Sequence, residues 1–283
     1  MNTNKILSKL EKEFLPKIAK YIISHNNKLP YVFKYRFYQN PDSVEEHKPK
    51  WHQWGIITHS LKFREAFDTQ VFKYLEQWGM KDQIEEYLAQ EIDGVPKKEL
   101  IRIAAPLHDL GKFQKGLKIK ENGKIKFDFS NHEELSEKLI LTHPVRRILK
   151  EFQLTDNQIE YIAKCAGNHY KLGFIRKKAK KSDVGYTMKF IESPEFYKMV
   201  KTELPKFEDL KVEIGLLFLS DSLGKCELNI SANSDEEIEY LIPKLEQEIK
   251  RRNLNPYLIE AVKQSPVNLA ASREYLKIAL NGN

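Results

Sequence analysis

A histidine and an aspartate stand side by side at residues 108 and 109, within the stretch APLHDLGKFQKG (105–116). An apolar run precedes them, and Gly111 and Lys112 follow. Imidazole nitrogens and carboxylate oxygens are ligands that divalent first-row metals accept readily. The pair alone also suits a helix end or a salt bridge, so its meaning depends on the rest of the chain.

Other histidines and one aspartate extend this pair into an ordered series. The series comprises His59 in GIITHSLKF, His108 and Asp109 with Lys112 in HDLGK, His132 in NHEELSEKL, His169 in CAGNHYKLG and Asp221 in LLFLSDSLGK. In this order and these motifs the chain resembles the HD superfamily of metal-dependent phosphohydrolases, over residues 59–221. The resemblance implies a helical fold, these six side chains as metal ligands, and Asp109 and Lys112 as catalytic residues.

The chemistry of the six candidate ligands agrees with the resemblance. Two imidazoles and two carboxylates, from His59, His108, Asp109 and Asp221, suffice for one divalent ion with open positions for water and substrate. His132 and His169 allow a second ion if Asp109 bridges both. We therefore expect two divalent transition-metal ions (Mn, Fe, Ni or Co) that activate a water for attack on phosphorus.

Basic residues cluster beside these motifs, within a chain that carries 47 Lys and Arg against 40 Asp and Glu. Lys112, Lys115, Arg176 and Lys177 are the predicted substrate-binding residues, because clustered cations attract phosphate-bearing molecules. The expected partner is an anionic phosphate compound, either a nucleotide or a single-stranded nucleic acid, whose bases stack on aromatic side chains. A solvated lysine-rich surface is the alternative reading.

The ligand series leaves two other functions open. Mixed-valent di-iron oxygenases of the HD superfamily use the same kinds of ligands, with dioxygen in place of water. A non-catalytic HD module that serves in regulation is the third alternative. The lysine clusters favour a phosphohydrolase over the oxygenase, and the complete ligand series argues against a non-catalytic module.

Helical periodicity dominates the sequence. Apolar stripes predict helices at about 3–24, 59–78, 82–91, 97–109, 132–141, 155–169, 207–222, 235–252 and 268–280. Reciprocal capping patterns are expected at Ser130–Glu133, Thr155–Gln158 and Ser234–Glu237. One segment alternates apolar and charged residues around Asn122-Gly123 and predicts a β-hairpin. Residues 170–191 phase poorly and are read as a loop or flap.

These patterns predict an all-α fold with a small inserted β-hairpin, and the resemblance implies an HD-like helical bundle. We expect a single domain over 1–283, with an HD-like core at about 51–225 and elaborations at 1–25 and 234–281. Two cysteines in the chain favour a reducing compartment, and no membrane-spanning run is visible. A cytoplasmic protein is therefore expected, and the sequence gives no indication of its oligomeric state.

Overall fold

Helices make up most of the computed structural model, which describes residues 2–119, 125–203, 206 and 209–281. The only strands among these residues form two small antiparallel pairs, which confirms the predicted all-α class. The chain groups into two compact units. The first unit comprises residues 1–48, 54–64 and 87–168, and the second comprises 49–53, 65–86 and 169–283. The single-domain interpretation stays a prediction.

The first unit holds the predicted HDLGK motif. Its elements are α1 (Thr3–Lys9), η1 (Leu10–Phe14), α2 (Leu15–Ser24), α3 (Tyr31–Gln39), η2 (Val44–His47), α4 (Ile56–Ala66), β1 (Glu91–Ile92), β2 (Val95–Pro96), α7 (Lys97–Ala104), η4 (Ala105–Leu107), η5 (Leu110–Gln114), β3 (Gly116–Ile119), β4 (Ile125–Asp128), α8 (His132–Leu141), α9 (His143–Glu151) and α10 (Asp156–Asn168). Helix α4 ends two residues beyond this unit.

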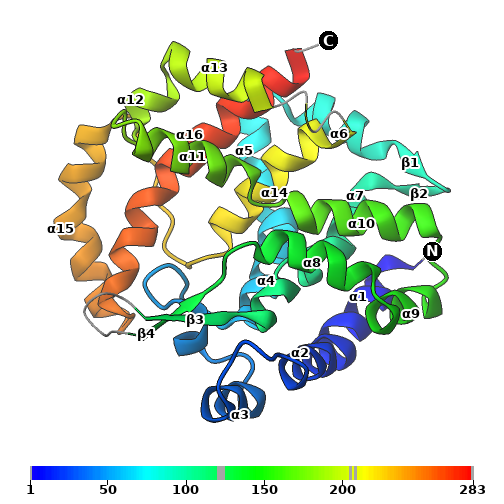
Figure 1. Cartoon of the computed structure of the whole chain (residues 1–283). Coiled ribbons are helices and arrows are strands. Elements are labelled where there is room, and N and C mark those ends of the chain that lie inside the picture. The colour runs from blue at the N-terminus through cyan, green and yellow to red at the C-terminus, as the bar shows by residue number, and fades with distance from the viewer. Residues whose placement is uncertain (1, 120–124, 204–205, 207–208, 282–283) are drawn as a thin grey trace. The chain divides into compact units, whose positions relative to one another are not determined.

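Helix α8 lies between α10 and the short helix η5 in the packing of this unit. Helices α8 and α10 run side by side (Figure 1). The Thr155 hydroxyl accepts from the Gln158 N–H, and the Gln158 side chain accepts from the Thr155 N–H, so the predicted reciprocal cap of α10 is confirmed. Helix α8 also contacts η5 directly, because the Gly111 N–H donates to the Ser136 hydroxyl at 2.9 Å.

The predicted β-hairpin is present as β3 and β4. The strands pair antiparallel with Gly116 opposite Asp128 and Leu117 opposite Phe127. The Asn122-Gly123 turn lies outside the described residues. Phe127 of β4 contacts Phe33 of α3 edge to face, so the hairpin packs against α3 through two partly buried rings.

A remote aspartate caps the start of α4. Asp42 accepts from the Thr58 N–H at 2.8 Å and from the Thr58 hydroxyl at 2.5 Å. A Cβ at Gly55 would lie 1.8 Å from the Asp42 carbonyl oxygen, so only glycine permits this approach. The cap therefore fixes the segment around residue 42 against the helix that carries His59.

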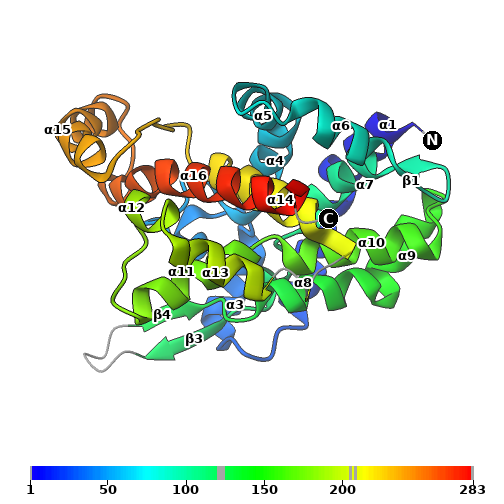
Figure 2. The same cartoon turned by 90° about the horizontal axis from the view of Figure 1, so that it is seen from above.

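The second unit is built around a helix that is buried on every side. Its elements are η3 (Phe67–Val71), α5 (Phe72–Gln77), α6 (Lys81–Ala89, ending beyond this unit), α11 (Lys171–Lys181), α12 (Met188–Ile191), α13 (Pro194–Glu203), α14 (Lys211–Leu223), α15 (Asp235–Arg251), η7 (Pro256–Leu258) and α16 (Ile259–Asn281). Helix α14 is buried from Val212 to Leu223, as its apolar sequence requires. It runs beside α16 (Figure 2), where a Cβ at Gly215 would lie 2.6 Å from Leu276.

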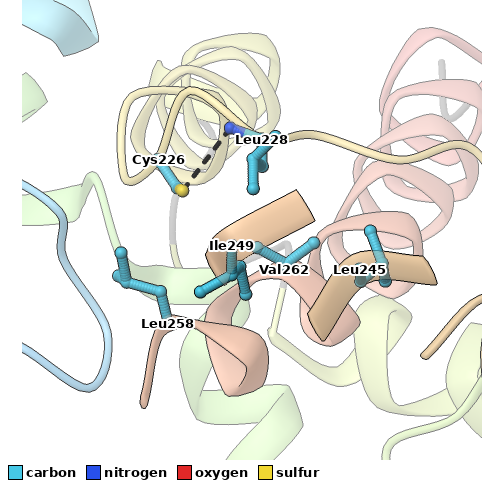
Figure 3. Close-up of a cluster of buried hydrophobic side chains, with 6 residues drawn as sticks. All are labelled: Cys226, Leu228, Leu245, Ile249, Leu258 and Val262. Atoms are coloured by element: carbon cyan, nitrogen blue, oxygen red, sulfur yellow. Dashed lines mark hydrogen bonds between the residues drawn. The ribbon is translucent and has the colours of Figure 1, made fainter. Parts of the chain in front are cut away.

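A separate apolar cluster joins α15, η7 and the start of α16 in the second unit. Its buried members are Cys226, Leu228, Leu245, Ile249, Leu258 and Val262 (Figure 3). The Leu228 N–H donates to the Cys226 sulfur at 3.4 Å. Burial raises the pKa of the Cys226 thiol, so the group stays protonated, and it donates to the Gln53 side-chain oxygen at 3.2 Å.

Two predictions of local structure were wrong. Residues 171–181 form helix α11 and not a loop, because its many Lys and Arg residues favour helix although they leave no clear apolar stripe. The cap expected at Ser130 is also different: α8 begins after Asn131 in the left-handed region, and the Ser130 hydroxyl donates to Asp128.

A helix that spans a membrane has to be long and strongly apolar. Within the residues that it describes, no helix combines the length and apolarity that crossing a bilayer demands.

Candidate metal centre

The HD pair lies where α7 gives way to short helical turns. Helix α7 ends at Ala104, one residue before η4, whose Pro106 has no N–H to continue an α-helical ladder. The chain then places His108 and Asp109 between η4 and η5, and both side chains are fully buried. The Lys112 N–H donates to the Asp109 carbonyl at 2.9 Å, which begins η5 and turns the Lys112 side chain back to the pair.

The Asp109 carboxylate is the centre of the site in the first unit. Its Oδ2 lies 3.2 Å from His108 Nε2 and 3.7 Å from His59 Nε2. Its Oδ1 lies 3.4 Å from His132 Nε2. Ligand nitrogens of His59 and His108 are also within 4.8 Å of each other. Four of the six predicted ligands therefore converge within this unit.

Backbone carbonyls set the tautomers of two of these imidazoles. His108 Nδ1 lies 2.7 Å from the Ala105 carbonyl oxygen, and His132 Nδ1 lies 3.0 Å from that of Phe129. A carbonyl only accepts, so each Nδ1 carries a hydrogen, and each ring turns Nε2, the nitrogen left for a metal ion, towards Asp109. Metal-binding histidines are usually oriented in this way by the second ring nitrogen.

Electrostatics keeps the central carboxylate ionised. Burial by itself would raise the pKa of Asp109, but His108, Lys112 and His132 together hold it well below its usual value. Lys112 Nζ lies 2.7 Å from Asp109 Oδ2. An anionic carboxylate is the state that a divalent cation requires of this ligand.

The spacing of these donors fits a shared cation. Two ligands of one ion can lie no farther apart than about 4.2 Å, the sum of two bonds of about 2.1 Å. The separations from Asp109 to His59, His108 and His132 all fall below this limit. The donor set of the first unit therefore suits a divalent transition metal.

Sequence reasoning missed one histidine of this centre. His47 is fully buried, its Nε2 lies 3.8 Å from Asp109 Oδ2, and its ring lies 5.3 Å from that of His59. Burial, with Lys112 and His59 nearby, lowers the pKa of His47 well below its usual value, so the ring is neutral. Its polar, charged surroundings in PDSVEEHKPK predict a loop, and no periodicity there points to burial.

Lys115, a predicted substrate-binding residue, has protein partners in the structure. Its ammonium is buried, lies 2.7 Å from the Glu46 carbonyl and 2.7 Å from the Glu46 carboxylate, and faces the rings of Phe37 and Phe127. Burial lowers the pKa of Lys115 to about 8. This buried pair fixes η2, and with it the adjacent His47.

The remaining predicted residues belong to the second unit. His169 and Asp221 are buried there, and Asp221 pairs with Lys225 at 2.5 Å. Arg176 and Lys177 lie on α11, both within cation–π range of the Tyr170 ring. Participation of His169 and Asp221 in the metal centre, and of Arg176 and Lys177 in substrate binding, stays a prediction.

Comparison with known families bears on the same segment. The family model of the HD domain matches residues 70–202. The match includes His108, Asp109, His132 and His169, begins after His59 and ends before Asp221. A search of curated proteins found no match. The family match and the buried histidines around Asp109 confirm that the chain contains an HD domain, the domain of a superfamily of metal-dependent hydrolases.

Proposed function

We propose that the protein is a metal-dependent phosphohydrolase that cleaves a phosphomonoester or phosphodiester. The observation that carries this proposal is the buried Asp109 carboxylate, with three imidazole Nε2 atoms and the Lys112 ammonium around it. A divalent ion held by these residues would supply an activated water and neutralise charge on the phosphoryl group.

The chain's own groups complete this chemistry. Asp109 has oxygens facing different imidazoles, so it suits the bridging role in a two-ion centre, with His132 on the Oδ1 side. Lys112 is 8% exposed and carries a positive charge beside the carboxylate. In such a dry site, a fixed ammonium stabilises negative charge that develops on a phosphoryl oxygen more strongly than it would in water. We therefore assign Lys112 to transition-state stabilisation.

The proposed substrate is a nucleotide or a single-stranded nucleic acid. Support comes from α11 and its surroundings, where Lys171 and Lys177 lie over Phe174 and Lys225 lies over Tyr170. Phe174 is 40% exposed, which leaves part of its ring available for stacking. Interleaved cations and rings of this kind bind the phosphates and bases of such ligands. We assign direct substrate contacts to Lys112, Arg176 and Lys177, and a supporting role to Lys115.

The test is a hydrolysis screen of protein reconstituted separately with Mn²⁺, Fe²⁺, Co²⁺ and Ni²⁺, with nucleotides, cyclic dinucleotides and short oligonucleotides as substrates. We expect release of phosphate or nucleotide in at least one metal form. Asp109→Asn should abolish the release, since a neutral amide cannot bridge ions. Lys112→Met should lower kcat, whereas Lys138→Met, at an exposed position of α8, should match the wild type.

The oxygenase alternative is tested in the same preparation. Iron-loaded protein prepared without oxygen is mixed with oxygenated buffer and each substrate, and oxygen uptake is recorded with phosphate release. Uptake of oxygen without any hydrolysis would contradict the proposed function, and a folded protein that binds no metal in any form would support the non-catalytic alternative.

A further inference from the structure

His47 lies outside the matched HD segment, yet it is built into the centre in the same way as the predicted ligands. Its Nδ1 lies 2.9 Å from the Trp54 carbonyl oxygen. His108 and His132 use Nδ1 in the same way, against the carbonyls of Ala105 and Phe129. All three rings therefore carry a hydrogen on Nδ1 and turn Nε2, the nitrogen left for a metal ion, towards Asp109.

We propose that His47 is a further metal ligand of this centre, supplied by η2 from outside the HD-domain match; the inference rests on the proposed metal-dependent function. The separation from His47 Nε2 to Asp109 Oδ2 is 3.8 Å, within the limit of about 4.2 Å for two ligands of one ion. The corresponding separation for His59, a predicted ligand, is 3.7 Å. By its separation from Asp109, His47 therefore meets the same limit as His59.

Two contacts from other parts of the first unit hold η2 in this position. Glu46, next to His47 in the chain, binds the buried Lys115 ammonium through its carboxylate and its carbonyl. Asp42 caps α4 through both the N–H and the hydroxyl of Thr58. An imidazole anchored on both sides loses little conformational freedom when it binds a cation, which favours ligation.

Lys112 makes the assignment testable. Its Nζ lies 2.9 Å from His47 Nε2 and therefore uses the lone pair that a metal would use. A metal ion and the Lys112 ammonium should compete for His47. Removal of the ammonium should tighten metal binding at least severalfold, because it removes both this competition and a positive charge 2.7 Å from Asp109.

The experiment measures Mn²⁺ affinity by calorimetry and Co²⁺ coordination by visible absorption, on the full chain with no substrate. The variants are His47→Ala, His47→Gln, Lys112→Met and the double variant Lys112→Met with His47→Ala. His47→Gln keeps a polar group that can contact Lys112 and the Trp54 carbonyl but removes the imidazole. His25→Ala, at an exposed histidine of the same unit, is the matched control.

We expect His47→Ala and His47→Gln each to weaken Mn²⁺ binding 10-fold or more and to change the Co²⁺ spectrum, whereas His25→Ala matches the wild type. The loss should persist when Lys112→Met is already present. If the loss disappears in that background, His47 serves only to position Lys112, and the inference is overturned. Equal affinity in all the His47 variants overturns it as well. A wild-type protein that binds neither ion would refute the proposed function instead, so the two failures are distinguishable.

Discussion

Substitution of Gly111 by alanine, which adds one methyl group, tests whether η5 and the start of α8 must lie in close contact to form the centre. It lies two residues after Asp109, and α8 begins directly against it with His132. A Cβ at Gly111 would lie 2.0 Å from the His132 carbonyl oxygen and 2.9 Å from the His132 carbonyl carbon. Cβ contacts below 3.0 Å are essentially never seen, so Gly111→Ala must separate η5 from the start of α8 by about 1.0 Å.

This displacement should lower both the stability of the protein and its turnover. Overpacking of a well-packed interior by one methyl group costs about 1–3 kcal/mol, and each kcal/mol lowers Tm by about 2–4 °C in chains of roughly this size. The same shift moves His132 from its 3.4 Å separation to Asp109. A misplacement of about 1 Å in a catalytic site costs about 100-fold in turnover. We therefore expect Gly111→Ala to lose both stability and metal-dependent activity.

Gly116→Ala is the matched control for this prediction. A Cβ there would meet only Lys28 Cβ at 3.7 Å, an ordinary contact, and Gly116 lies in β3 of the same unit. Differential scanning calorimetry and Mn²⁺ titration are performed on both variants and the wild type. A Gly111→Ala protein that melts and binds Mn²⁺ like Gly116→Ala would refute the close approach of η5 and α8 on which the site depends.

Three further perturbations test the Asp109 bridge, the cap of α4 and the buried ammonium of Lys115. Asp109→Ala should lower metal content at every position, measured by inductively coupled plasma mass spectrometry, and full occupancy would contradict the bridging role. Asp42→Ala removes the cap of α4 and should lower the free energy of unfolding by about 1–2 kcal/mol in urea titrations; an unchanged value would show that the cap adds nothing. Burial lowers the pKa of Lys115 to about 8, below its value of about 10.4 in the unfolded chain. Between these pH values Lys115 therefore takes up a proton when the protein unfolds. The free energy of unfolding of the wild type should accordingly rise from pH 8 to pH 10. Lys115→Met should show a smaller rise over this range, and an identical rise would remove Lys115 as its cause.

The sequence allowed the local features of the centre to be predicted. HDLGK is a contiguous motif, and the start of α8 at His132 follows from its apolar periodicity, so both are encoded within a few residues. Gly111 of this motif approaches the start of α8 too closely for any side chain, a contact that only the structure shows.

The role of η2 could not be predicted in this way. His47 reaches Asp109 only because Asp42 caps a helix that begins 14 residues later and because Lys115 binds Glu46 across 69 residues of chain. Neither contact leaves a periodic pattern or a motif. The burial of Lys115 was missed for the same reason, since an isolated lysine beside a basic run reads as solvent-exposed until its carboxylate partner is located.

Binding of a metal ion at Asp109 is tested most directly by anomalous diffraction from crystals grown with Mn²⁺. We expect an anomalous peak about 2.0–2.3 Å from an Asp109 carboxylate oxygen and from the Nε2 atoms of His108 and at least one of His47 and His59. Crystals with Mn²⁺ at full occupancy elsewhere and none at Asp109 would contradict it.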